Sequence, residues 1–249
     1  MKTVFICAVS MSGWLTLGAC AQTGHGVDTL RADSSYVYRA SSDDGTGKYY
    51  FGREIAPVMG HLGAEWLERP AREQEERTDW LVKALALQPT DVIADVGAGT
   101  GYFSFRLAEA VPQGKVWAVD VQPEMITLLH KNKQRLLGTQ PAAAVVAPLL
   151  STITDPKLPA NKLDLVLLVD AYHEFSHPRE MVMHLVRALK PNGRIALVEY
   201  RAEDPSVAIK PLHKMSEAQA RKEMSAAGLV FVNTNDLLPQ QHLMFFKKP

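Results

Sequence analysis

The stretch that decides the fold is Asp95-Val96-Gly97-Ala98-Gly99-Thr100-Gly101-Tyr102, which joins an apolar run to a helical pattern. The run before the glycines, residues 91–96, is typical of a buried parallel strand. Glycines at alternate positions allow the backbone to turn sharply and to lie close to a ligand, because a Cβ atom would block that approach. The helix that begins at Tyr102 offers unpaired N–H groups at its start. The stretch therefore predicts a ligand-binding loop at the end of a strand.

The glycine spacing and a carboxylate on the next strand narrow the ligand class. A nicotinamide or flavin fingerprint, G-x-G-x-x-G, would have glycine where Tyr102 stands, and the chain has no G-x-x-x-x-G-K-[ST] phosphate loop. Roughly twenty residues beyond the loop the next strand ends at Asp120, where a carboxylate can accept both hydroxyls of a ribose. Alternatively, Asp95 is a strand-end turn residue and Asp120 a helix cap.

Apolar runs and helical patterns alternate through the rest of the chain. After residues 91–96, strands are predicted at residues 115–120, 142–147, 163–170, 194–200, 229–234 and 243–247. Helices are predicted at residues 102–110, 123–137, 179–189 and 217–227, the third ending at the breakers Lys190-Pro191-Asn192-Gly193. This alternation predicts an α/β fold that is Rossmann-like and doubly wound, with a mostly parallel seven-stranded sheet and helices on both faces. Residues 49–78 carry a charged helical pattern and predict an N-terminal helical extension.

Over residues 76–247 the chain resembles the class I S-adenosylmethionine-dependent methyltransferases. The resemblance is carried by DVGAGTGY (95–102), VWAVDVQPEM (116–125), LDLVLLVDAYHEF (163–175) and LVRALKPNGRIALVEY (185–200). It implies a methyltransferase domain at residues 79–249 with S-adenosylmethionine as its cofactor.

The resemblance also implies which residues hold the cofactor. Asp95 and the backbone of Gly97, Gly99 and Gly101 would surround the aminocarboxypropyl group, and Asp120 would bind the ribose. Residues 152–154 would lie by the adenine, with Asp155 the nearest candidate for its amino group, because the usual acidic triplet is absent. The predicted cofactor-binding set is Asp95, Gly97, Ala98, Gly99, Thr100, Gly101, Asp120, Val121, Thr152, Ile153, Asp155 and Asp170.

The candidate catalytic residue follows the fourth strand of the domain, where ligands bind in open α/β sheets. HEFSHP (173–178) resembles the corresponding stretch of small-molecule O-methyltransferases, in which the matching histidine is the general base. Histidine titrates in the range that suits removal of a hydroxyl proton. This implies His173 as general base, with Glu174 or Asp170 as its orienting partner. The alternative is a histidine that lines the pocket or bonds to the backbone.

Four further residues are predicted to line the acceptor pocket: His61, Trp66, Tyr172 and His213. The first two belong to the N-terminal extension, which in this family often folds over the cofactor. His213 follows the fifth strand, in a region that often forms part of an acceptor lid. Trp66 could instead anchor a helix packed on the domain, and His213 could lie in an ordinary surface loop.

Composition and missing motifs exclude several function classes. The 249 residues carry 27 Lys+Arg and 27 Asp+Glu, and this balance disfavours nucleic-acid binding. Both cysteines lie in the first twenty residues, so the predicted domain has no thiol nucleophile. The eight histidines are scattered along the chain, and no metal site is predicted. The [DN]-P-P-[YFW] motif of adenine methylation is absent, so a small or lipid-like acceptor is favoured by elimination.

The first residues predict a signal peptide that directs export. Lys2 precedes an apolar run that is too short and interrupted for a membrane span but suits a signal peptide at residues 1–19. Leu17-Gly18-Ala19-Cys20 resembles a bacterial lipobox, which implies lipidation of Cys20 and a membrane anchor. Residues 20–48 then predict a flexible tether. Ordinary secretion and a buried N-terminal helix are the alternatives, and the protein is cytoplasmic if the segment is not a signal.

Two function classes stay open. The first is a methyltransferase acting on a small or lipid-like acceptor, with O-methylation as one form of it. The second is a non-catalytic envelope lipoprotein that uses the fold as a ligand-binding module. The second class is considered because S-adenosylmethionine is made in the cytoplasm, whereas the predicted signal peptide would place the protein outside it.

Overall fold

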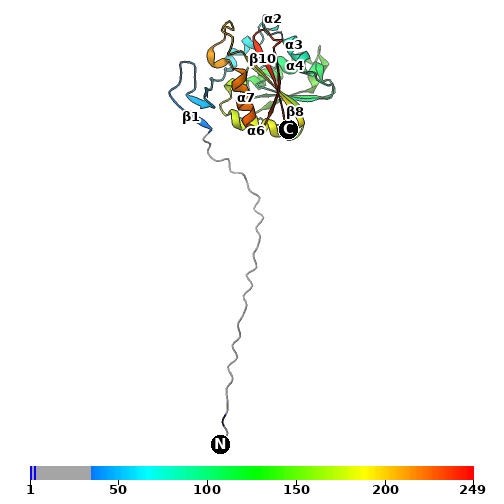
Figure 1. Ribbon diagram of the computed structural model, residues 1–249. Helices are drawn as coiled ribbons and strands as arrows, with labels where there is room; N and C mark the ends of the chain where they lie inside the picture. The colour runs from blue at the N-terminus through cyan, green and yellow to red at the C-terminus, as the bar shows by residue number, and fades with distance from the viewer. Residues whose placement is uncertain (2, 4–34) are drawn as a thin grey trace. The chain divides into compact units, whose positions relative to one another are not determined.

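The computed structural model of the chain describes residues 1, 3 and 35–249 (Figure 1). Its centre is a seven-stranded sheet in the order β6-β5-β4-β7-β8-β10-β9. The strands β4 to β8 pair in parallel, whereas β10 pairs antiparallel with both β8 and β9. The strands are β4 (Val92–Val96), β5 (Lys115–Asp120), β6 (Val146–Leu150), β7 (Leu163–Val169), β8 (Leu189–Tyr200), β9 (Val230–Asn235) and β10 (Gln241–Lys247).

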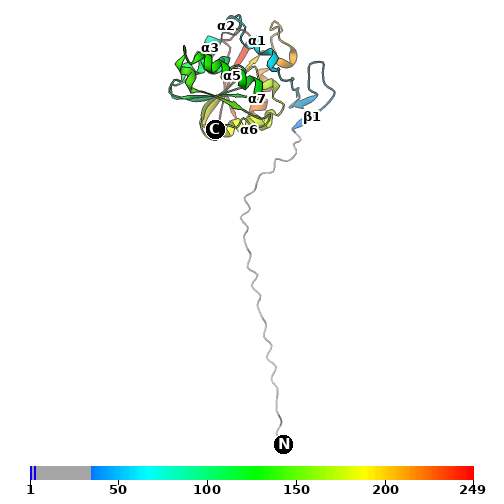
Figure 2. The ribbon, with the colours of Figure 1, turned by 180° about the vertical axis from the view of Figure 1, so that it is seen from behind.

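Helices cover both faces of this sheet, as Figures 1 and 2 show from opposite sides. The main helices are α3 (Thr78–Ala84), α4 (Tyr102–Ala110), α5 (Pro123–Leu136), α6 (Pro178–Ala188) and α7 (Glu217–Ala226). Leu107 of α4 and Leu129 of α5 belong to one buried apolar cluster, and Leu185 of α6 and Met224 of α7 to the other. Successive residues of a strand point to opposite faces, so the apolar strands fill both clusters. The predicted Rossmann-like fold is confirmed.

The largest differences from the predicted strand boundaries are at β6 and β8. The strand expected at residues 142–147 begins only at Val146, because residues Pro141–Val145 form the 3-10 helix η2. Proline fixes the first backbone angle there, and the alanines that follow have low strand propensity. The predicted breakers Lys190-Pro191-Asn192-Gly193 lie inside β8, where the register with β7 shifts and Asn192 has φ +66°.

The N-terminal part of the described chain corrects the predicted helical extension at residues 49–78 and the end of the predicted tether. A small antiparallel sheet forms from β1 (Tyr36–Tyr38), β2 (Lys48–Tyr50) and β3 (Arg53–Glu54). Only short helices follow it: η1 (His61–Gly63), α1 (Ala64–Leu67) and α2 (Arg72–Glu76). The glycine at position 52, with φ +95°, allows the tight β2–β3 turn.

The predicted signal-peptide core, Cys20 and residues 20–34 of the predicted tether lie outside the described residues. Among the residues that are described, no helix combines the length and the apolar character needed to cross a membrane.

The strand order places one edge of the sheet in position to bind a ligand. The chain runs outward from β4 through β5 to β6 and then returns to β7 on the other side of β4. Such a reversal leaves a crevice at the carboxyl ends of the parallel strands. Two short helices begin the segments beyond β7 and β8: η3 (Tyr172–Glu174) and η4 (Pro211–His213).

Candidate functional site

A cavity of about 480 Å³ opens at the carboxyl ends of the parallel strands. Its walls come from the ends of β4, β5, β7 and β8 and from the segments before β4 and after β8. The sequence-predicted residues that line it are Trp66, Gly97, Gly99, Asp120, Val121, Thr152, Ile153, Asp170, His173, Glu174 and His213. The structure therefore brings together residues from every predicted motif.

The glycine loop forms one wall and needs its glycines. Gly97 has φ +82°, and a Cβ atom there would lie 2.6 Å from the Cβ atom of Ala171. Gly99 has φ +54°, and a Cβ atom would lie 2.5 Å from Cδ1 of Leu67. Both φ values are left-handed and the space is closed, so any larger residue would strain the loop. The backbone can thus approach a ligand closely at these two positions.

Asp120 joins this loop to the end of β5. Its Oδ2 accepts the N–H of Gly99 at 2.9 Å and its Oδ1 accepts the N–H of Gln122 at 2.9 Å. Burial raises the pKa of this carboxyl, although the two backbone donors act in the opposite direction. Each carboxylate oxygen keeps a further lone pair for a ligand hydroxyl.

Gln122, which sequence reasoning missed, connects this wall to the N-terminal segment. Its Nε2 donates to the carbonyl of Met59 at 3.0 Å, and its Oε1 accepts the backbone N–H of His61 at 2.9 Å. Gln122 and Met59 both line the cavity, whereas His61 does not and contributes only this backbone bond. The Asp-x-Gln spacing was the only local sign of this role.

A second part of the cavity lining carries a charged pair and an unpartnered carboxylate oxygen. Oδ2 of Asp170 accepts Nε2 of Gln241 at 2.8 Å, whereas its buried Oδ1 has no hydrogen-bond partner among the described residues. Burial raises the pKa of Asp170 well above its ordinary value, and Glu76 and Glu199 raise it further. Arg72 lies on the same wall and bonds to Glu76 at 3.0 Å.

These groups fit the amino-acid end of S-adenosylmethionine. An ammonium could satisfy Oδ1 of Asp170, and a carboxylate could bind the guanidinium of Arg72. The ribose hydroxyls would meet Asp120, beside the backbone of Gly97 and Gly99, which also line the cavity. The residues present therefore fit the cofactor that the resemblance implies.

His173 lies at the far side of the same cavity, on η3, and is 2% exposed. Its Nδ1 is 2.6 Å from Oε2 of Glu199, and its backbone N–H donates to Oε1 of the same carboxylate at 3.2 Å. Burial, the largest single effect, lowers the pKa of His173, but the charge and hydrogen bond of Glu199 and the charge of Glu174 together outweigh it, so the pKa is raised overall.

The orienting partner of His173 is therefore Glu199, not Glu174 or Asp170 as predicted. Asp170 is engaged with Gln241, and Glu174 lies on the opposite side of the ring, with Oε1 3.7 Å from Nε2. Glu199 comes near the end of β8 and is fully buried. Its only sign in the sequence was a charged residue within the apolar run 194–200.

Short segments hold η3 in place from the N-terminal side. Nη1 of Arg53 and the N–H of Ala56 both donate to the carbonyl of His173, at 3.0 and 3.3 Å. The N–H of Met59 donates to Oε2 of Glu174 at 3.1 Å. Trp66 is half exposed on this wall, with the guanidinium of Arg69 3.8 Å above its ring. The extension thus contributes to the cavity wall through a loop and the short helix α1 rather than through the long helix predicted.

Several predicted site residues do not line the cavity because other contacts engage them. Asp95 is buried behind the loop and accepts Oγ of Ser104 at 2.6 Å, and burial raises its pKa to about 6. Tyr172 is fully buried and donates its hydroxyl to Glu223 at 2.8 Å. Asp155 pairs with Lys157 at 2.9 Å, so no acidic side chain from this stretch reaches the predicted adenine position.

The remaining three lie within the loop itself. The N–H of Ala98 donates to the carbonyl of Val119 at 3.0 Å, which closes the turn. Thr100 is buried and donates its hydroxyl to Glu68 at 2.5 Å. Gly101, at φ +92°, starts α4. All three shape the loop without facing the cavity.

Comparisons with known proteins agree with this geometry. Residues 94–195 match the family described as a methyltransferase domain. An uncharacterized methyltransferase-like protein from Schizosaccharomyces pombe is 30% identical over 162 residues, which are 65% of this chain and 57% of that protein. A ubiquinone/menaquinone biosynthesis C-methyltransferase from Cupriavidus metallidurans is 27% identical over 154 residues, 60% of this chain and 58% of its own. The chain therefore spans less than two thirds of these relatives.

Among solved structures, a SAM-dependent methyltransferase from Aquifex aeolicus superposes with a TM-score of 0.71 at 23% identity, covering 77% of this chain and 100% of that one. That likeness establishes the fold. Together with the matched family and the cavity, it leads to one conclusion. Residues 94–195 match a methyltransferase domain, and the fold around them is that of a SAM-dependent methyltransferase.

Proposed function

We propose that the whole protein transfers a methyl group from S-adenosylmethionine to a small or lipid-like acceptor. The observation that supports this most is that the Gly97–Gly99 backbone and Asp120 open on the same cavity as His173. The proposed nucleoside site and the imidazole of His173 therefore line the same cavity. When bound, S-adenosylmethionine supplies a methyl group on a sulfonium, which is an electrophile.

In this proposal the two ends of the cavity have separate tasks. Asp120 and the glycine loop hold the ribose, and Asp170 with Arg72 holds the amino-acid end. The short segments around Met59 and Trp66 cover the site and exclude water, which favours the charged cofactor's reaction over hydrolysis. The role of this chain's residues is mainly to bind and to orient.

For an acceptor with a hydroxyl group, His173 is proposed as the general base. Its Nδ1 is occupied by Glu199 at 2.6 Å, so Nε2, which lies 3.2 Å from Nδ1 of His213, is the nitrogen left to accept a proton. The buried carboxylate would stabilise the imidazolium that results. A carboxylate–histidine pair of this kind suits O-methylation.

The acceptor is proposed to be apolar over much of its surface. Val58, Met59, Phe175, Met181 and Ile209 line the cavity near the histidine. One of the relatives is named a ubiquinone/menaquinone biosynthesis C-methyltransferase, and on that ground we propose a lipid-like acceptor for this chain. The same class of acceptor fits these apolar walls.

Two measurements test the function. Calorimetric titration of the full chain with S-adenosylmethionine should give one site with micromolar affinity, and label from methyl-labelled cofactor should enter a small molecule of a cell-envelope extract. Cofactor binding without any transfer would favour the non-catalytic module, and a folded protein that binds no cofactor would overturn the proposal.

We also propose that the protein is exported and anchored through Cys20. The proposal rests on the lipobox-like Leu17-Gly18-Ala19-Cys20 in the sequence. A fatty-acid probe should label cells that express the full chain and should not label the Cys20→Ser variant. Equal labelling of the two would contradict the anchor.

A further inference from the structure

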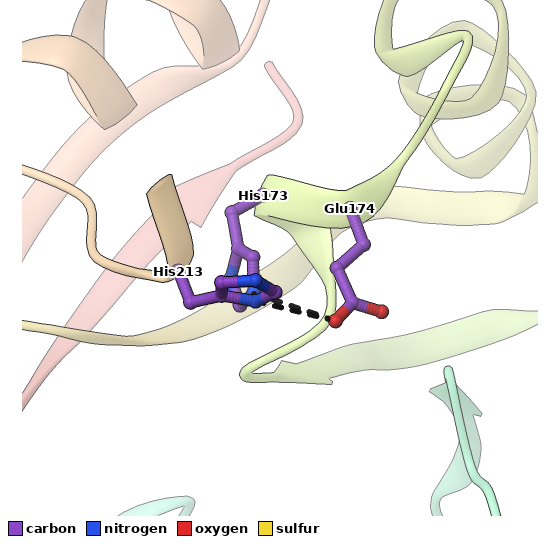
Figure 3. A group of neighbouring side chains, drawn as sticks. All are labelled: His173, Glu174 and His213. Carbon is purple, nitrogen blue, oxygen red and sulfur yellow. Dashed lines mark hydrogen bonds and ion pairs between the residues drawn. The ribbon is translucent and has the colours of Figure 1, made fainter. Parts of the chain in front are cut away.

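Three side chains that line the cavity lie together, although they come from two separate segments (Figure 3). His173 and Glu174 come from η3, and His213 comes from η4. Nε2 of His173 is 3.2 Å from Nδ1 of His213, and Oε1 of Glu174 is 3.7 and 3.5 Å from these two nitrogens. Their side chains are 3%, 15% and 21% exposed, so none is a freely solvated surface group.

The outer nitrogens of both histidines face carboxylates. Nδ1 of His173 lies 2.6 Å from Glu199, and Nε2 of His213 lies 3.4 Å from Oδ2 of Asp44. Oδ2 of Asp44 is buried and has no hydrogen bond of its own among the described residues. In metal sites a ligating histidine almost always donates its second N–H to such a partner. Here both histidines have one.

The space between the three side chains has no hydrogen-bond donor when the N–H groups of both histidines point outward. A neutral imidazole has one N–H group. If each histidine donates it in a hydrogen bond to its outer carboxylate, two nitrogen lone pairs and an oxygen of Glu174 face one another across 3.2–3.7 Å. One extra proton could bridge only one of these contacts. A cation at the centre would satisfy all three.

The local charge favours a divalent cation. Glu174, Glu199 and Asp44 contribute three negative charges, and Lys210, which bonds to Asp44 at 2.8 Å, contributes one positive charge. With both imidazoles neutral, the cluster is therefore left with an excess of two negative charges. Arg53 does not change this balance, because Glu223 pairs with it.

The size of the cluster also matches a small transition-metal ion. A circle through three atoms at these separations has a radius of about 2.0 Å, close to the bond lengths of zinc to imidazole nitrogen and carboxylate oxygen. We propose that His173, Glu174 and His213 bind one divalent transition-metal ion, with Zn²⁺ as the best fit.

The site would be of the open type. Three protein ligands leave a fourth position, and all three residues line the cavity. That position would hold a water molecule or the nucleophilic oxygen or sulfur of an acceptor, whose pKa the ion would lower. A cation and a proton on Nε2 exclude each other, so with metal bound the ion would replace His173 in activating the acceptor.

The test is direct metal binding by the full chain, stripped with a chelator and titrated calorimetrically with Zn²⁺. We expect one ion per chain with submicromolar affinity. Glu174→Gln and His213→Ala should each weaken binding on the order of 100-fold, and Asp44→Asn about tenfold, as expected for an outer partner. His130→Ala, which removes an exposed histidine, should bind like the wild type. Circular dichroism confirms that each variant is folded.

X-ray absorption then identifies the ligands. Only nitrogen and oxygen neighbours at about 2.0–2.1 Å are expected, and sulfur at about 2.3 Å would instead assign the ion to Cys7 or Cys20 and overturn the proposal. Equal affinity in wild type and both ligand variants would also overturn it. Titration with S-adenosylmethionine is run separately. A chain that binds the cofactor but no zinc refutes the metal site alone, and the reverse refutes only the proposed function.

Discussion

Asp120 illustrates how one side chain can shape a loop and still serve a ligand. Two backbone N–H groups hold its carboxylate, one from Gly99 in the loop and one from Gln122 behind it. The remaining lone pairs face the cavity that the residue lines. Binding and loop geometry therefore depend on the same group.

The first prediction concerns the charge of this residue. Asp120→Asn should weaken S-adenosylmethionine binding about 10- to 100-fold, because hydrogen bonds to a charged group contribute about 1.5–3 kcal/mol. Calorimetric titration measures the change. Asp236→Asn, at an exposed position, is the control and should bind normally. Equal affinities would remove Asp120 from the cofactor site.

The second prediction compares two glycines with nearly the same backbone angle. Gly97 has φ +82° and closed space around it, whereas Gly228 has φ +84° with nothing within 4 Å of an added Cβ. Gly228→Ala should lower the free energy of unfolding by about 1–2 kcal/mol, the cost of a left-handed alanine. Gly97→Ala should cost about 1–3 kcal/mol more, because the new methyl group would overlap Ala171. Urea denaturation of both variants measures the difference, and equal losses would contradict the steric argument.

Single residues were predictable where a local pattern marks them. The glycines and Asp120 are recognisable because a strand end and a turn fix their places. Glu199 and Gln122 were not, since neither forms part of a repeating pattern. His173 and His213 approach each other across forty positions, and no periodicity connects η3 with η4.

Among the elements, β4 and α4 are joined by a buried carboxyl. Ser104 of α4 donates to Asp95 of β4 at 2.6 Å, inside the layer between helix and sheet. The strand could be predicted from its apolar run, but the burial of its one carboxyl could not. That burial has a consequence for stability.

The third prediction is the pH dependence that follows. Burial raises the pKa of Asp95 to about 6 from about 3.9 in an unfolded chain, so the folded chain holds this proton more tightly. The contribution is fully present below pH 4 and is lost as the pH rises through 6. Relative to Asp95→Asn, the wild type should lose about 2 kcal/mol of unfolding free energy between pH 4 and pH 7.

Denaturant titrations of both proteins at several pH values measure this loss. All other carboxyls are common to the two chains, so their titration cancels in the comparison. A difference that does not change with pH would show that Asp95 titrates normally in the folded state.

At the scale of the whole molecule, segments from distant parts of the sequence are clasped together around η3. Arg53 of β3 bonds to Glu223 of α7 through Nε at 2.8 Å and Nη2 at 2.9 Å, although 170 positions separate them. Tyr172 donates to the same glutamate at 2.8 Å. The N-terminal sheet was missed in the sequence because its strands are only two or three residues long.

The fourth prediction is that this clasp matters for stability. Arg53→Ala should lower the unfolding free energy by about 3–5 kcal/mol, since it leaves the buried charge of Glu223 without its cation, with only the neutral donors Tyr172 and Gln219 remaining. Arg221→Ala removes an exposed ion pair with Glu217 and should cost less than about 1 kcal/mol. Thermal and urea unfolding compare the two, and losses of similar size would refute the buried pair's importance.

The residues that line the cavity lie both inside and outside the range that matches the methyltransferase-domain family. The residues proposed to hold the ribose, Gly97, Gly99 and Asp120, lie within residues 94–195, whereas Val58, Met59 and Trp66 come before that range and Ile209 and His213 after it. If the proposed function holds, substitutions in these flanking segments could change the acceptor without altering the ribose site. A chimera that joins residues 72–195 of this chain, which include Arg72, to the flanking segments of another relative should keep the affinity for S-adenosylmethionine and take on that relative's acceptor preference.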